Sequence, residues 1–176
     1  TEIKPMPLIQ KTVSESGIKV ITEEMPGVES STIGIWVTSG SRNETPALSG
    51  VSHFIEHLLF KGTHRRSALD ISREIESVGG VLNAFTGREY TCFYVKVLNK
   101  DLPLAIDLLS DIFINSRFDK VEMDKEKMVV LQEIKMVDDT PDDIIHDIFA
   151  ERFWPGHPLG RPILGTSETI KSMERA

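Results

Sequence analysis

The segment HFIEHLLFKGT, residues 53–63, constrains the fold more than any other part of the chain. Its apolar residues predict a buried helix, yet His53, Glu56 and His57 stand among them. An α-helix turns by about 100° per residue, so these three polar side chains share one arc of the helix. Apolar residues occupy most of the remaining circumference. We therefore expect this helix to be enclosed nearly all round, with its polar arc facing a lined cavity.

Five further segments predict strands. LIQKTV and IKVITEEM flank residues 14–17 and indicate an opening hairpin. STIGIWVTSG alternates in polarity and predicts a half-buried strand. VLNAFT and TCFYVKVL are separated by GREY, which indicates a second antiparallel hairpin. We expect Trp36 and Phe93, which lie in two of these strands, to belong to the core.

The remainder of the chain is predominantly helical in pattern. We expect helices over residues 68–78, 101–114, 119–137 and about 142–152, and a last helix capped at Ser167 that continues to the end of the chain. Strands first and helices after, with antiparallel hairpins, predict an α+β fold. Its sheet should be mostly antiparallel, with the helices packed on one face to give two layers.

Composition excludes several classes of protein. Cys92 is the only cysteine, so no intrachain disulfide can form, and a reducing, cytoplasmic location fits. The net charge of −7 argues against nucleic acid as a partner, because phosphate binding needs a basic surface. We expect no membrane association, since no run approaches the roughly 18 apolar residues of a membrane helix. At 176 residues the chain has the length of one ordinary domain.

The polar arc of the first helix has the spacing of a metal site. Two imidazoles at i and i+4, His53 and His57, can bind one cation, and Glu56 lies close enough to act on water at that ion. The pattern His-x-x-Glu-His is the inverted form of the common zinc-protease signature. In the alternative interpretation the histidines make local hydrogen bonds and Glu56 caps a helix or pairs with a cation.

A catalytic zinc ion needs a third protein ligand. Glu126 and Glu133 both lie on the apolar stripe of the helix predicted over residues 119–137. Burying a carboxylate without a partner costs several kcal/mol, so each should be paired, neutralised or bound to metal. Alternatively, both lie at the rim of the stripe and bend outward to water or to a lysine such as Lys127. Spacing alone leaves both interpretations open.

Five segments in order resemble the N-terminal domain of the insulinase and pitrilysin family of metallopeptidases. They are GIWVTSGSRNE, HFIEHLLFKGT, VLNAFTGREYTCFYVKVL, KEKMVVLQEIKMVDDTP and HPLGRPILGT. Within that family, the chain is most similar to bacterial relatives of the mitochondrial processing peptidase β-subunit. The resemblance extends from about residue 8 to residue 173.

This resemblance implies a site with one zinc ion per domain. His53, His57 and Glu133 match the family's three ligands, and Glu56 matches its general base. Glu126 matches a family glutamate that supports the ligands from behind.

The resemblance also implies how substrate binds. Family members bind a peptide as an added strand along a sheet edge, and the matching residues here are Asn83, Ala84 and Phe85. In the alternative interpretation, Asn83 is a polar strand residue near a turn. A group of aspartates between residues 138 and 147 could attract basic peptides or could simply form a solvated helix start.

We therefore expect a zinc-dependent endopeptidase that hydrolyses extended peptides or presequences, with a zinc-bound water activated by Glu56. Zinc lowers the pKa of water to about 7, low enough for a positioned carboxylate to take its proton, so metal and base are both required. The alternative is a non-catalytic family subunit that acts as a scaffold or binding partner. A purely structural zinc site is disfavoured because Glu56 would then have no role.

Family members usually carry two or more domains of this fold. Residues 1–176 match one N-terminal zinc-binding peptidase domain, which we expect to be truncated before its C-terminal end. The second family domain is absent from this sequence. We expect a C-terminal domain or a partner subunit to complete the peptide-binding cleft.

Overall fold

A three-stranded antiparallel sheet is the centre of the structure, a computed structural model that describes residues 8–175. The strands β3 (Ser30–Val37), β5 (Thr91–Leu98) and β4 (Val81–Thr86) lie in the order β3-β5-β4. The β4–β5 hairpin has the boundaries that the sequence predicts. Because β4 lies at the edge of this sheet, one side of its backbone is open to another strand.

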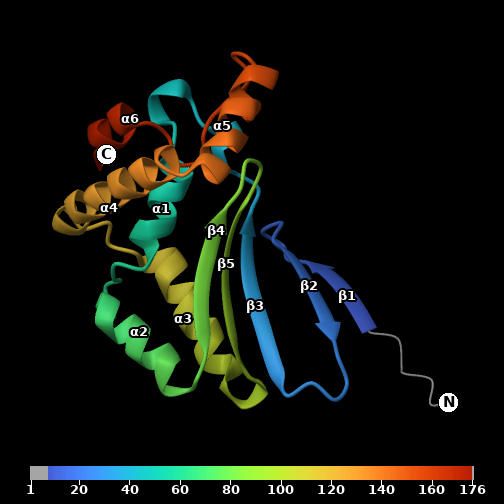
Figure 1. The fold of residues 1–176 in the computed structure, drawn as a ribbon. Helices are drawn as coiled ribbons and strands as arrows, with labels where there is room; N and C mark the ends of the chain where they lie inside the picture. The colour runs from blue at the N-terminus through green and yellow to red at the C-terminus, as the bar shows by residue number, and fades with distance from the viewer. Residues whose placement is uncertain (1–7, 176) are drawn as a thin grey trace.

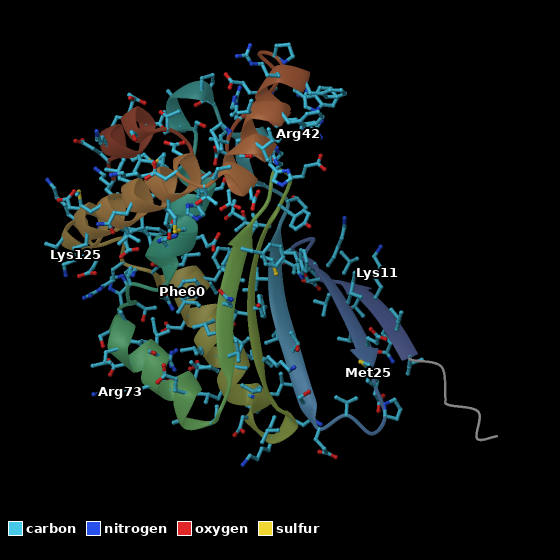
Figure 2. All side chains as sticks on the ribbon, viewed as in Figure 1. Lys11, Met25, Arg42, Phe60, Arg73 and Lys125 are labelled. Carbon is cyan, nitrogen blue, oxygen red and sulfur yellow. The ribbon has the colours of Figure 1, made fainter. Side chains whose placement is uncertain are left out.

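The opening hairpin also forms as predicted, but it is not part of the central sheet. Strands β1 (Leu8–Val13) and β2 (Lys19–Glu24) make a separate two-stranded sheet, and all of their residues are exposed. Figure 1 shows this hairpin beyond β3, on the side away from the helices. Figure 2 shows Lys11 and Met25 in this outlying part of the molecule.

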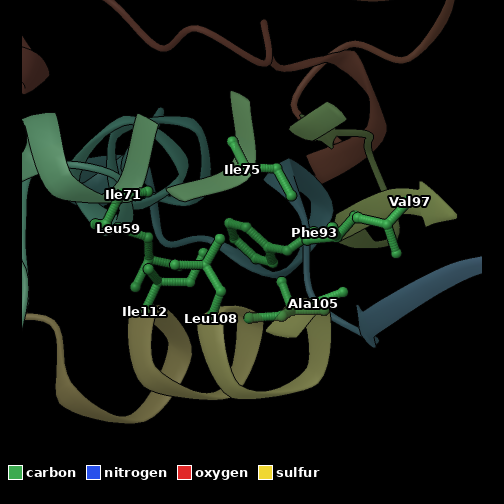
Figure 3. Close-up of a cluster of buried hydrophobic side chains, with 10 residues drawn as sticks. Leu59, Ile71, Ile75, Phe93, Val97, Ala105, Leu108 and Ile112 are labelled. Carbon is green, nitrogen blue, oxygen red and sulfur yellow. The ribbon is translucent and has the colours of Figure 1, made fainter. Parts of the chain in front are cut away.

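Two helices cover one face of the central sheet and form the main core with it. They are α2 (Ala68–Ser77) and α3 (Leu102–Asn115). Figure 3 shows Phe93 of β5 between Ile75 of α2 and Leu108 of α3. The three side chains are 4% exposed or less, so the prediction that Phe93 belongs to the core is confirmed.

The same prediction for Trp36 is wrong, because this side chain is 62% exposed. Alternate residues of a strand point to opposite faces of the sheet. Ile35 and Val37 pack against the core, so Trp36 points to the face that carries no helix. There it contacts Phe85 and Tyr90, with ring centroids 5.8 and 5.4 Å away.

A second core holds together the helices that carry the predicted metal site. These helices are α1 (Val51–Leu59), α4 (Lys120–Asp138) and the short α6 (Ser167–Ser172). Their shared buried residues are Phe54, Leu58, Met123, Val130, Ile170 and Met173. Hydrophobic burial therefore fixes how α1 crosses α4 (Figure 1).

The helix α1 is enclosed nearly all round, as predicted, since Ile55 is its only exposed residue, at 39%. The prediction for α6 needs correction. The cap of α6 is Thr166 rather than Ser167, since the Thr166 side chain accepts a hydrogen bond from the backbone N–H of Thr169. This helix ends at Ser172 instead of continuing to the end of the chain.

The other helices lie within a few residues of their predicted ranges. Asp119 caps α4, where its carboxylate accepts from two backbone N–H groups. The helix α5 (Pro141–Phe153) follows α4 directly and projects beyond it (Figure 1). None of the helices within residues 8–175 has the length and apolar composition needed to cross a membrane.

Candidate metal centre

The N-terminus of α1 is held in place by a buried glutamate. Glu44 accepts hydrogen bonds from the backbone N–H of Gly50, at 2.7 Å, and from that of Ser52, at 2.8 Å. A carboxylate also stabilises the positive end of the helix dipole. Gly50 itself has a φ of 91°, and a Cβ there would lie 2.5 Å from the Leu164 carbonyl oxygen. The backbone at Gly50 and the Glu44 hydrogen bonds therefore fix how α1 begins and which way its polar arc points.

The polar arc of α1 faces α4. His53 Nε2 lies 3.8 Å and His57 Nε2 lies 3.4 Å from Glu133 Oε2. One ligand atom from each of the three residues can be chosen so that all lie within 4.8 Å of one another. The structure thus brings together two histidines and a glutamate that are far apart in the sequence.

The chemistry of this cluster fits a divalent cation. Within the part of the chain that the structure describes, Glu133 Oε2 is buried and has no hydrogen-bond partner. Burial, and to a lesser degree the nearby His57, lowers the pKa of His53 to about 4, so this imidazole is neutral at pH 7 and can donate a lone pair. Two imidazole nitrogens and one carboxylate oxygen are ligands that zinc accepts in open, catalytic sites.

A buried glutamate supports His57 from behind. Glu126 is 5% exposed, and its Oε2 lies 3.0 Å from His57 Nδ1. Lys61 Nζ lies 2.7 Å from its other oxygen. In this position Glu126 can accept a hydrogen bond from Nδ1–H of His57, which would leave the Nε2 lone pair free to bind a cation.

The alternative in which Glu126 bends outward to Lys127 does not hold. Lys127 Nζ lies 3.9 Å from Asp124 instead. Sequence reasoning missed Lys61 as the partner of Glu126. Lys61 lies in the turn after α1, which ends at Leu59, so helix spacing gave no signal of this contact.

Glu56 lies beside the cluster on the same helix. Its Oε2 accepts a hydrogen bond from the Thr86 hydroxyl at the end of β4. Burial raises the pKa of the Glu56 carboxyl, although the Thr86 hydrogen bond and the nearby His57 act in the opposite direction. A carboxylate with a raised pKa suits general acid and base chemistry near neutral pH. Sequence reasoning did not single out Thr86.

The edge strand β4 borders a cavity of about 410 Å³ next to the cluster. His53 and Glu56 line this cavity, together with two of the three residues predicted to bind substrate, Ala84 and Phe85. Asn83, the third, is exposed and lies outside the lining. Its side chain instead accepts a hydrogen bond from the backbone N–H of Ala84.

The helix α5 forms an acidic wall of the same cavity. Asp143, His146 and Asp147 line it, so two of the aspartates grouped in the sequence face the predicted substrate site. Asp147 lies 3.3 Å from Arg88, which comes from the β4–β5 turn. Asp143 has no cationic partner within residues 8–175, so it places negative charge within reach of a peptide lying along β4.

Sequence comparison relates the chain to named peptidases. The family described as insulinase, peptidase family M16, matches residues 19–167. A protein of Streptomyces coelicolor named as an uncharacterized zinc protease is 49% identical over 94% of this chain and 36% of its own length. The mitochondrial-processing peptidase subunit beta of Rattus norvegicus is 41% identical over 97% of this chain and 35% of its own length. The chain thus spans little more than a third of either relative.

Solved structures show the same fold. A protease from Helicobacter pylori superposes with a TM-score of 0.91, at 24% identity, over 96% of this chain and 41% of its own. Pitrilysin superposes with a TM-score of 0.82, at 27% identity, over 95% of this chain and 18% of its own.

Proposed function

This chain belongs to the insulinase family, peptidase family M16, and we therefore propose that it forms the N-terminal, zinc-binding part of a metalloendopeptidase. The observation that carries the proposal is the convergence of His53, His57 and Glu133, with Glu56 on the same helix arc. These three residues would hold one zinc ion. A relative that is named as a zinc protease and is 49% identical supports this choice of metal.

Each residue of the site has a role in this proposal. When bound, zinc supplies a Lewis acid that makes water acidic and polarises a carbonyl. Glu56 takes the proton of the attacking water and later returns it to the leaving amine, so the peptide bond is broken by the addition of one water. Glu126 holds His57 in the tautomer that leaves Nε2 free.

The edge strand suggests an extended peptide as substrate. The open side of β4 can pair with a peptide as an added strand, which would lie along Ala84 and Phe85. Asp143 across the cavity favours peptides with a basic side chain near the scissile bond, presequences among them. We propose that a C-terminal domain or a partner subunit, outside this chain, completes the cleft.

A non-catalytic scaffold is the alternative from a different class. A scaffold needs no carboxylate like Glu56, partly buried beside two imidazoles and held by a hydrogen bond. This arrangement favours the enzyme.

The test uses the full-length gene product and a panel of quenched fluorescent peptides. We expect hydrolysis that a chelator abolishes and added zinc restores, with faster cleavage of peptides that carry arginine. A Glu56→Gln variant prepared in parallel is the control for contaminating proteases. A purified protein that contains no zinc, gains none on addition and cleaves nothing would favour the scaffold.

A further inference from the structure

We propose that Thr86 is a positioning residue for Glu56, so that the strand receiving the peptide also holds the general base in place. This inference rests on the proposed function and adds a residue to which neither the sequence motif nor the comparisons assign a role. It starts from one contact. The Thr86 hydroxyl donates a hydrogen bond to Glu56 Oε2 across 30 positions of sequence.

The direction of Thr86 follows from the pleat of β4. Successive side chains of a strand alternate between faces. Along β4, Ala84 and Thr86 are partly buried on the side of the helices, whereas Asn83 and Phe85 are exposed. Thr86 is the last residue of the strand and is level with the polar arc of α1. It is therefore the strand residue that reaches Glu56.

The Glu56 side chain has few other restraints. Glutamate has three rotatable side-chain bonds, and within residues 8–175 Thr86 provides the only hydrogen bond to this carboxylate. The bond engages Oε2 and leaves Oε1 for the reacting water. Without it, the carboxylate can rotate among several conformations, and only some of them place an oxygen at the attacking water.

Thr86 is itself a firm anchor. A β-branched side chain has restricted rotation about χ1. The backbone of Thr86 lies opposite Thr91 in the β4–β5 ladder, and the Thr91 hydroxyl donates to the Ser39 carbonyl at 2.9 Å. The end of the hairpin is therefore tied to the end of β3, and it carries the Thr86 hydroxyl with it.

This arrangement links binding to chemistry. A peptide that adds to the open edge of β4 hydrogen-bonds to the same strand that orients Glu56. The strand that binds the peptide therefore also sets the position of the base.

The kinetic test compares Thr86→Val, which keeps the shape and removes the hydroxyl, with Thr86→Ser, which keeps the hydroxyl. In the full-length protein we expect Thr86→Val to lower kcat by about 10- to 100-fold with little change in KM. Thr86→Ser should recover most of the loss. Thr32→Val, an exposed site on β3, is the matched control and should behave as the wild type. A wild-type kcat in Thr86→Val, or equal losses in the Val and Ser variants, would overturn the proposal.

Two readouts do not depend on turnover. Thr86→Val should leave zinc content unchanged, and in a Glu56→Gln background it should leave the affinity for a peptide unchanged. Weaker binding of metal or peptide would show a general structural role instead. Crystal structures of the wild type and Thr86→Val should show Glu56 in a new orientation in the variant. An unmoved Glu56 overturns the inference even if the protein has no peptidase activity, which separates its failure from that of the proposed function.

Discussion

Replacing Lys61 by methionine tests whether the buried carboxylate behind His57 is held as the structure indicates. The chain offers a matched control, because Lys61 lies 2.7 Å from Glu126 and Lys125 lies 2.7 Å from Glu122. The two distances are equal, but the first pair is more buried. The side chains of Lys61 and Glu126 are 32% and 6% exposed, whereas those of Lys125 and Glu122 are 63% and 29% exposed.

The magnitude follows from burial. Two unit charges at the Lys61–Glu126 distance attract by ~6 kcal/mol at an effective dielectric constant of about 20, before desolvation is subtracted. Removing one partner of a buried pair costs about 3–5 kcal/mol. The Lys61 side chain is 32% exposed and His57 remains as a second partner of Glu126. We therefore expect Lys61→Met to destabilise the zinc-free protein by about 2 kcal/mol, and Lys125→Met by at most about 0.5 kcal/mol.

Urea unfolding of the zinc-free chain, followed by circular dichroism, measures this difference. With an m value of about 2 kcal/mol/M, the midpoint of Lys61→Met should fall by about 1 M. Equal midpoints for the two variants would refute this reasoning.

Three other predictions follow from the site and the core. Glu56→Gln should retain zinc by metal analysis but lose about 10²- to 10⁴-fold in kcat on peptides, and full turnover would place the base elsewhere. Asp143→Asn should raise KM by about two- to fivefold for a peptide with arginine near the scissile bond and should not change KM for its neutral counterpart. Burial opposes ionisation of Asp111, but hydrogen bonds led by those from Asn115 and Arg66 outweigh it and lower its pKa. Because the folded pKa lies below the unfolded one, the stability from Asp111 is present above pH 3.8 and is lost as the pH falls through the folded pKa. Asp111→Asn should therefore be less stable than the wild type at pH 7, and its stability should fall less steeply below pH 4 in urea titrations at each pH.

Periodicity predicted most of the fold, because apolar spacing reports which side of an element is buried. It placed Phe93 in the core, but it could not tell which face of the sheet the helices cover, and so it misplaced Trp36. The single-position error at Thr166 has a similar origin. Thr166 and Ser167 are both good capping residues, and only the backbone path selects between them.

In the candidate site too, some residues could be predicted from the sequence and others could not. Helix spacing joined His53 to His57, because both lie on one short element. Glu133, the third residue of the cluster, comes close to the histidines only because of the way α4 crosses α1. From the sequence, only the family resemblance could assign it to the site. The partners Lys61 and Thr86 come from tertiary packing across helix, loop and strand, and periodicity within one element carries no information about such contacts.

X-ray absorption and anomalous diffraction at the zinc edge of the zinc-loaded, full-length protein test the central claim most directly. We predict one ion per domain, bound by the Nε2 atoms of His53 and His57 and by the carboxylate of Glu133 at about 2.0–2.2 Å. A zinc ion bound elsewhere, or bound by the histidines with Glu133 turned away, would contradict the account.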